Sequence, residues 1–159
     1  MSMIYLWVSV FLSICVVMDL LYAKVFNSYI LASFGISIIL LLLNLSAISH
    51  WSHPLLSFVL VFVVGLALFK FKILGAGDVK SMLVVALFLN PNQSIMFLAY
   101  SIIWGGVFSL VYFLAQGSLF RLIFTTAAVF KRAAYAVHKI PFTVGILFGW
   151  FSLRVLGLY

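Results

Sequence analysis

Apolar runs close to twenty residues long recur along the whole chain, separated by short polar breaks. A run of this length can cross the hydrocarbon core of a bilayer as a helix. The pattern therefore predicts an all-α integral membrane protein, with about six transmembrane helices in one membrane-embedded domain over residues 1–159. The predicted spans are residues 3–22, 29–45, 55–69, 78–90, 94–115 and a last one that opens at Pro141 and runs to the C-terminus.

Residues 118–139 differ in kind from the spans. Polar and basic residues recur there at spacings of four and seven, on one face of a helix: Arg121, Thr125, Arg132 and Lys139. This pattern is typical of an amphipathic helix that lies at the membrane surface. The other breaks predict an interfacial loop at 46–54 and a short turn at Asn27 and Ser28.

The charge distribution supports the membrane interpretation and predicts an orientation. The chain is 67% hydrophobic and only 7% charged, yet its formal net charge is +7. Lys and Arg lie in the breaks between spans, which argues against nucleic acid as a partner. If the spans alternate in direction, all nine of these residues except Arg154 fall on one membrane face. The positive-inside rule makes that face cytoplasmic and puts the N-terminus outside, and the basic face is expected to contact anionic lipid.

The chain contains only two acidic residues, Asp19 and Asp78, and no Glu. An ionisable side chain at membrane depth is costly, so each is a candidate functional residue. The same alternation of spans puts both on the basic face. Two carboxylates brought close together share a proton, so one can activate a water while the other protonates a leaving group. The pair therefore predicts acid–base hydrolysis of a peptide bond without a metal or a covalent intermediate.

Each carboxylate also has a purely structural interpretation. An Asp that follows glycines at a helix start is a favoured N-cap, which would account for Asp78. An interfacial position close to Lys24 would account for Asp19, although a helix C-terminus disfavours negative charge. The two helix positions suggest a division of roles, with Asp78 as the general base and Asp19 as the general acid.

Further residues are candidates to support the two carboxylates: Gly75, Gly77, Lys80, Lys24 and Asn27. The glycines either let the backbone bend and pack near Asp78 or belong to a plain loop. The lysines either orient substrate or extend to the interface as snorkelling side chains, and the Asn can hold loop backbone. Cys15 stands alone in an apolar run, and the sequence predicts no metal and no cofactor.

Residues 75–80, Gly-Ala-Gly-Asp-Val-Lys, resemble the GxGD motif of the type IV prepilin peptidases, which are integral-membrane aspartic proteases. In that family a first Asp is followed by a basic residue and then by Asn; here Asp19, Lys24 and Asn27 stand in the same order. Residues 140–145 resemble the Pro-aromatic-Gly segment of the family. The three matches come in the family's order and extend over nearly the whole chain.

The resemblance implies cleavage of prepilin leader peptides at the cytoplasmic face of the bacterial inner membrane, with Asp19 and Asp78 catalytic. The chain has no CxxC motif and no soluble insertion after the first Asp. It is therefore similar to the short, peptidase-only enzymes of tight-adherence (Flp) pili, and methyl transfer is not expected. Departures from the family pattern are Ala76, Lys24 and Phe26, none of which removes a carboxylate.

Two other classes of function stay open at this point. A small proton- or cation-coupled transporter would also keep acids in its membrane helices, although transporters often place them near the bilayer midplane. A non-enzymatic membrane scaffold would tolerate Asn at either acidic position.

Overall fold

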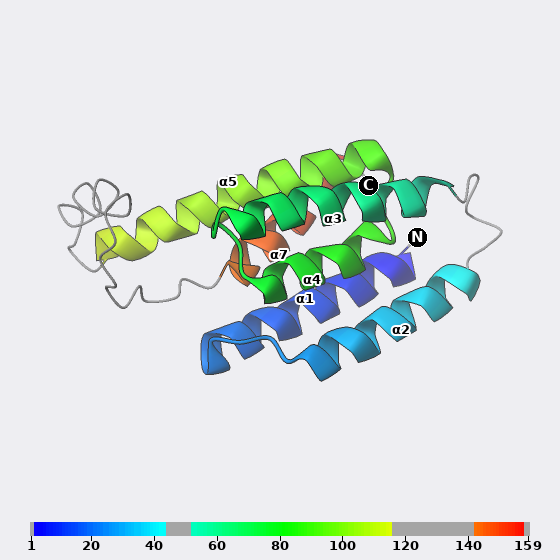
Figure 1. Cartoon of the computed structure of the whole chain (residues 1–159), viewed down its shortest axis with the longest axis horizontal. Coiled ribbons are helices and arrows are strands. Elements are labelled where there is room, and N and C mark those ends of the chain that lie inside the picture. Colours follow the sequence, from blue (N-terminus) through cyan, green and yellow to red (C-terminus); the bar gives the residue numbers. More distant parts are fainter. Residues whose placement is uncertain (1, 44–51, 116–141, 158–159) are drawn as a thin grey trace.

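The computed structural model describes residues 2–43, 52–115 and 142–157, which form an all-helical bundle (Figure 1). Its helices are α1 (Ser2–Tyr22), α2 (Asn27–Leu43), α3 (Ser52–Lys70), α4 (Ala76–Ala86), α5 (Pro91–Ala115) and α7 (Thr143–Val155). The predicted helical class is confirmed. The predicted surface helix at 118–139 and the predicted start of the last span at Pro141 lie outside the described residues.

Successive helices run in opposite directions, as Figure 1 shows. One end of the bundle therefore gathers the last turns of α1, α3 and α5 with the first turns of α2, α4 and α7. Helix α4 lies at the centre, where it contacts α1, α2, α3 and α7. Its apolar side chains Met82, Val84 and Val85 are fully buried. The central helix is therefore held from several sides, and so is the Asp78 near its start.

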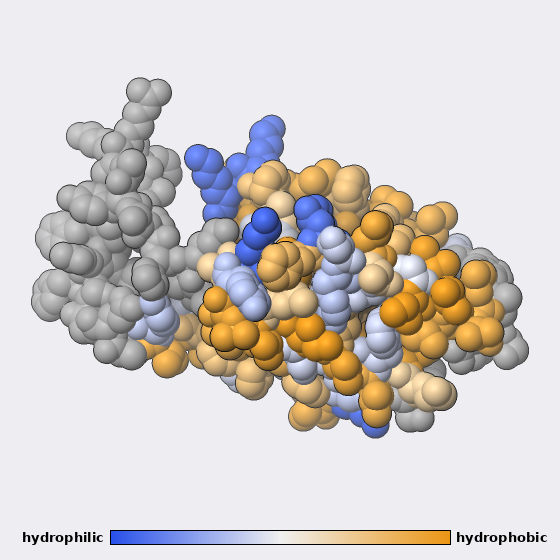
Figure 2. All heavy atoms as spheres, turned by 90° about the horizontal axis from the view of Figure 1, so that it is seen from below, coloured by the Kyte–Doolittle hydropathy of each residue, from blue (hydrophilic) through white to orange (hydrophobic). Residues whose placement is uncertain are grey.

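Within the described residues, three helical segments have the length and the apolar composition needed to cross a membrane: Met3–Tyr22, Ser52–Lys70 and Pro91–Tyr112. Helices α2 and α7 are apolar but shorter. Many large apolar side chains are exposed on the outside of the bundle, and Figure 2 shows one such face as mostly hydrophobic. Small polar side chains such as Ser33 and Ser57 are buried between helices instead, as is common in membrane bundles.

The fourth predicted span is too long. Helix α4 has 11 residues and ends at Ala86, which corresponds to about 16 Å of helix, against a hydrocarbon core of about 30 Å. A turn then leads to α5. The Ser57 hydroxyl of α3 donates a 2.6 Å hydrogen bond to the Leu89 carbonyl of this turn. The buried Ser57 side chain thus provides a hydrogen bond to a carbonyl group that lies beyond the end of α4.

Three predicted boundaries also shift. Asn27 is the first residue of α2 rather than part of a turn, and α5 begins at Pro91, a residue favoured in the first turn of a helix. Residues 52–54 are already helical, so this part of the predicted interfacial loop is wrong; residues 46–51 lie outside the described part of the chain. Ser, Asn and Pro were read as loop residues, whereas here they start helices.

Two of the described helices are followed by non-glycine residues with left-handed backbone. Ala23 (φ 49°) follows α1, and its N–H donates to the Asp19 carbonyl at 2.9 Å. Lys72 (φ 58°) follows α3, where its own N–H and that of Ile73 donate to carbonyls of the last helical turn. These are common C-terminal caps, which satisfy carbonyls left without helical partners. The first of them fixes the end of α1 just beyond Asp19.

Helices α5 and α7 approach each other through glycines. A Cβ atom added at Gly145 would lie 2.7 Å from the Gly105 backbone nitrogen, and one at Gly149 would lie 2.9 Å from the Ser101 nitrogen. Neither distance is sterically possible for a real side chain, so the backbones are in direct contact. The spacing Gly145-x-x-x-Gly149 is typical of such close helix packing. This contact sets the position of Thr143 at the start of α7.

Candidate active site

The two acidic residues flank a direct contact between α1 and α4. The Ser81 hydroxyl on α4 lies 3.8 Å from the Cys15 sulfur on α1, in the buried interior. Asp19 follows Cys15 by four residues, and Asp78 precedes Ser81 by three. Since the helices are antiparallel, both steps of about one turn lead toward the same end of the bundle. Asp19 and Asp78 are both half-buried there.

Asp78 lies in the first turn of α4 but is not its N-cap, so that part of the prediction is wrong. The N-cap is Gly75, and Asp78 is the third residue of the helix. The Gly75 N–H donates a 3.0 Å hydrogen bond to Asp78 Oδ2. The carboxylate thus turns back over the helix start, in the manner of a capping-box acid. Negative charge is favourable at this position, since it faces the positive end of the helix dipole.

Asp19 lies in the last turn of α1, as the sequence predicted. Its Oδ2 accepts a hydrogen bond of 2.9 Å from the hydroxyl of Thr143, which is 1% exposed at the start of α7. The two residues are 124 positions apart in the chain. A buried donor from a third helix therefore fixes one oxygen of the Asp19 carboxylate, at a helix end where the dipole gives negative charge no support.

Glycines allow close packing beside the start of α4. Gly77 faces Val25 of the segment between α1 and α2, at an ordinary van der Waals distance for an added Cβ. Gly65 of α3 faces Val79, where an added Cβ would lie 2.8 Å from a methyl group. The start of α4 thus packs between α3 and the α1–α2 segment, and the space at Gly77 would accommodate a methyl group.

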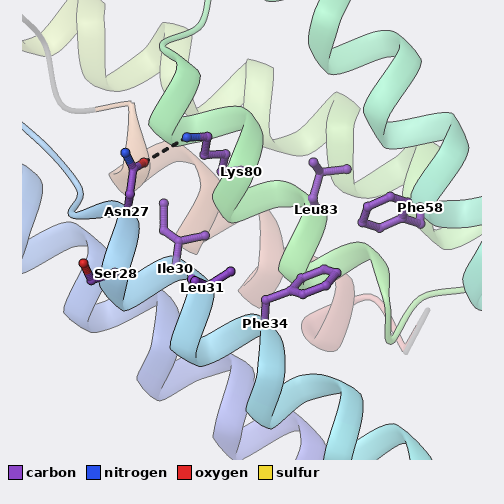
Figure 3. A pocket seen from close by; sticks show the side chains of 8 residues that line it. All are labelled: Asn27, Ser28, Ile30, Leu31, Phe34, Phe58, Lys80 and Leu83. Atoms are coloured by element: carbon purple, nitrogen blue, oxygen red, sulfur yellow. Dashed lines mark hydrogen bonds between the residues drawn. The ribbon is translucent and has the colours of Figure 1, made fainter.

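The remaining residues that the sequence singled out are Lys80, Asn27 and Lys24. Lys80 donates a hydrogen bond of 2.9 Å to the side-chain oxygen of Asn27, which joins α4 to the first residue of α2 (Figure 3). Lys24 is exposed in the segment between α1 and α2. Of these three residues, the structure therefore brings Lys80 and Asn27 into contact.

Sequence reasoning missed three residues of this site. Thr143 lies in the family-like segment 140–145 but has no predicted role, and Cys15 is predicted only to be a lone thiol. Ser81, one turn beyond Asp78, was not considered. A helical repeat of three or four residues from each Asp would have found Cys15 and Ser81 as members of the same helix faces. Nothing in the sequence alone indicates that Thr143 reaches Asp19.

The arrangement offers acid–base chemistry. Each carboxylate has a fixed oxygen, bound by a backbone N–H in one case and by a hydroxyl in the other. Over the described residues, no group of three or more His, Cys, Asp and Glu side chains could hold a metal ion. The described part of the chain therefore presents two half-buried carboxylates at one end of an apolar bundle.

These features define a membrane protein of several helices with a pair of acidic residues at one end. Residues 6–110, well over half of the chain and including both Asp19 and Asp78, match the type IV leader peptidase family. The chain belongs to this family. No curated protein and no solved structure matches it. The family match ends before α7, so Thr143 lies outside the matched residues.

Proposed function

We propose that this protein is an aspartic endopeptidase that removes the leader peptide from type IV prepilins, with Asp19 and Asp78 as its catalytic pair. One observation carries the assignment to these residues. Cys15 of α1 contacts Ser81 of α4, and each Asp lies about one turn from this contact, toward the same end of the bundle. Membership of the type IV leader peptidase family supports the substrate class.

In the proposed reaction, Asp78 acts as the general base and Asp19 as the general acid. Ionised Asp78 takes a proton from a water molecule, whose oxygen attacks the carbonyl carbon of the scissile amide. Asp19 then protonates the leaving amine, and the peptide bond breaks. The helix start at α4 favours the charged form of Asp78, which supports this division of roles.

The location of the pair suggests how a prepilin is presented. Lysines gather at the same end of the bundle as the carboxylates: Lys24, Lys70, Lys72 and Lys80. The positive-inside rule makes this end cytoplasmic and puts the N-terminus outside the bacterial inner membrane. A prepilin has a polar leader followed by an apolar helix. We expect that boundary to meet Asp19 and Asp78 about one turn below the cytoplasmic surface.

We further infer a peptidase-only enzyme that acts on Flp-like pilins. The inference rests on the absence of any CxxC motif from residues 1–159. The larger members of the family that also methylate the new N-terminus carry such a cysteine-rich segment. Methyl transfer is therefore not part of the proposed activity.

The deciding experiment uses purified protein in liposomes with a Flp-type prepilin. Wild type should release the leader, whereas Asp19→Asn and Asp78→Asn should each lose cleavage by about a thousandfold or more, since each removes a proton-transfer group. Both variants keep the size of the side chain, and circular dichroism checks their fold. Retained cleavage by either would exclude the catalytic pair. Proton flux without cleavage would instead favour the transporter.

A further inference from the structure

A groove on another face of α4 is not used by the proposed reaction. Its volume is about 470 Å³, and Figure 3 shows its lining side chains. The lining comes from three helices: Asn27, Ser28, Ile30, Leu31 and Phe34 of α2, Phe58 of α3, and Lys80 and Leu83 of α4. We propose that this groove binds one anionic phospholipid, with the phosphate at Lys80 and an acyl chain along the apolar part.

The groove has a polar end, which could hold a phospholipid head group, and an apolar part, which could hold an acyl chain. Its polar side chains, Asn27, Ser28 and Lys80, all lie in the first turns of α2 and α4. The lining of α2 continues to Phe34, about 10 Å further along the helix, through apolar residues only. The polar end is thus at the level of the bundle end, and the apolar part extends toward the middle of the membrane.

The charge of the polar end selects an anionic head group. The Lys80 ammonium has three N–H donors, and the Asn27 side-chain oxygen accepts from one of them at 2.9 Å. This hydrogen bond holds the ammonium at the mouth of the groove, where it can meet a phosphate. Lys70 and Lys72 are exposed at the same end of the bundle and add to its positive potential. A zwitterionic head group would bring its own cation toward these lysines.

The groove is poorly placed to hold the substrate helix. Lys80 follows Asp78 by two residues, which is a rotation of about 200° around α4. The groove therefore opens on nearly the opposite side of α4 from the carboxylate. A helix seated there would be separated from the catalytic pair by α4 itself, whereas an acyl chain needs no access to Asp78.

The test measures lipid binding rather than cleavage, so its result is independent of the proposed peptidase activity. The full chain is purified in detergent, and its melting temperature is followed while phosphatidylglycerol or phosphatidylcholine is added. We expect phosphatidylglycerol to stabilise wild type at lower concentration. Lys80→Gln should weaken its apparent affinity by about fivefold, the effect of one lysine near an anionic head group. Lys70→Gln is the matched control, since it removes a lysine from the same end but not from the groove.

A second variant tests the apolar part without a change in charge. Leu31 lines the groove and is 73% exposed, so Leu31→Trp should fill space there without disturbing the core. We expect it also to weaken the effect of phosphatidylglycerol. Glycerol phosphate, the head group alone, should give no stabilisation.

Several outcomes would overturn the assignment. Equal losses in Lys80→Gln and Lys70→Gln would indicate general attraction to the basic surface. Equal stabilisation by the two lipids would show that the groove does not select an anionic head group. Stabilisation by glycerol phosphate alone would show that binding does not need an acyl chain. If Lys80→Gln instead raises the KM for a prepilin and leaves the lipid preference intact, the groove holds substrate.

Discussion

The Thr143 hydroxyl donates a 2.9 Å hydrogen bond to Asp19, although 124 positions separate the two residues in the chain. Thr143 is buried at the first position of α7, and α7 is held against α5 by glycine-to-backbone contacts. The position of one proposed catalytic oxygen thus depends on how two other helices pack. In the proposed enzyme, Thr143 is a positioning residue for Asp19.

Thr143→Val should lower kcat for prepilin cleavage by about tenfold, because it removes the hydrogen bond that orients the Asp19 carboxyl group while keeping the side-chain shape. KM should change little, since Thr143 is proposed to orient the acid and not to bind substrate. Thr143→Ser keeps the hydroxyl and should retain most of the activity. Equal losses in the two variants would point to packing and not to the hydrogen bond.

The two glycines of the GxGD motif should respond differently to substitution. A Cβ added at Gly75 would lie 3.0 Å from Asp78 Oδ2, whereas one at Gly77 would lie 3.7 Å from Val25. Gly75→Ala should therefore displace the Asp78 carboxylate and lower kcat by about tenfold or more, with the helical signal unchanged. Gly77→Ala is the matched control from the same motif and should cleave nearly as well as wild type. The reverse order of sensitivity would show that the Asp78 carboxylate does not depend on its contact with Gly75.

Ala23→Gly should stabilise the protein. Ala23 has φ of 49°, a left-handed conformation that costs a non-glycine residue about 1 kcal/mol and costs glycine little. The gain is reduced by the greater freedom of glycine in the unfolded chain. Thermal unfolding in detergent should show a small rise in melting temperature, with the Asp19 backbone carbonyl still capped. A lower melting temperature would mean that the Ala23 methyl group contributes packing that outweighs the backbone strain.

Gly145→Ala should destabilise the bundle by about 1–3 kcal/mol, because its Cβ would lie 2.7 Å from the Gly105 backbone and would force α7 away from α5. Cleavage should fall with it, since Thr143 moves with α7. Gly106→Ala is the control: it adds a Cβ to α5 where no atom lies within 4 Å. That variant should keep both stability and activity, and similar losses in the two would argue against a specific α5–α7 contact.

The pattern of apolar runs and polar breaks predicts the all-helical class and the alternating direction of the helices. It also predicts that Asp19 and Asp78 lie at the same end of the bundle. These follow from the length of the apolar runs and from the alternation of direction, which need no side-chain detail. The glycine spacing at Gly145 and Gly149 likewise indicated a close helix contact. In each case one regular spacing determined the structure.

The features that the sequence pattern does not predict depend mostly on contacts between helices. The end of α4 at Ala86 was missed because the apolar run continues to Leu89 without any stop signal. Asp78 was placed at the N-cap because an Asp after glycine favours that position, whereas the helix starts earlier and the carboxylate folds back to Gly75. The bond from Thr143 to Asp19 arises from tertiary packing alone, and local preference does not encode it.

Because α4 ends early, the apolar barrier along this helix is thinner than the hydrocarbon core of a bilayer. Along α4 only about 12 Å of helix separates the half-buried Asp78 from the turn before α5, where Asn90 is exposed. Water drawn to the carboxylates therefore meets a thinner barrier here than in the surrounding bilayer. The fully buried side chains of Met82, Val84, Val85 and Ala86 form the apolar part of this barrier.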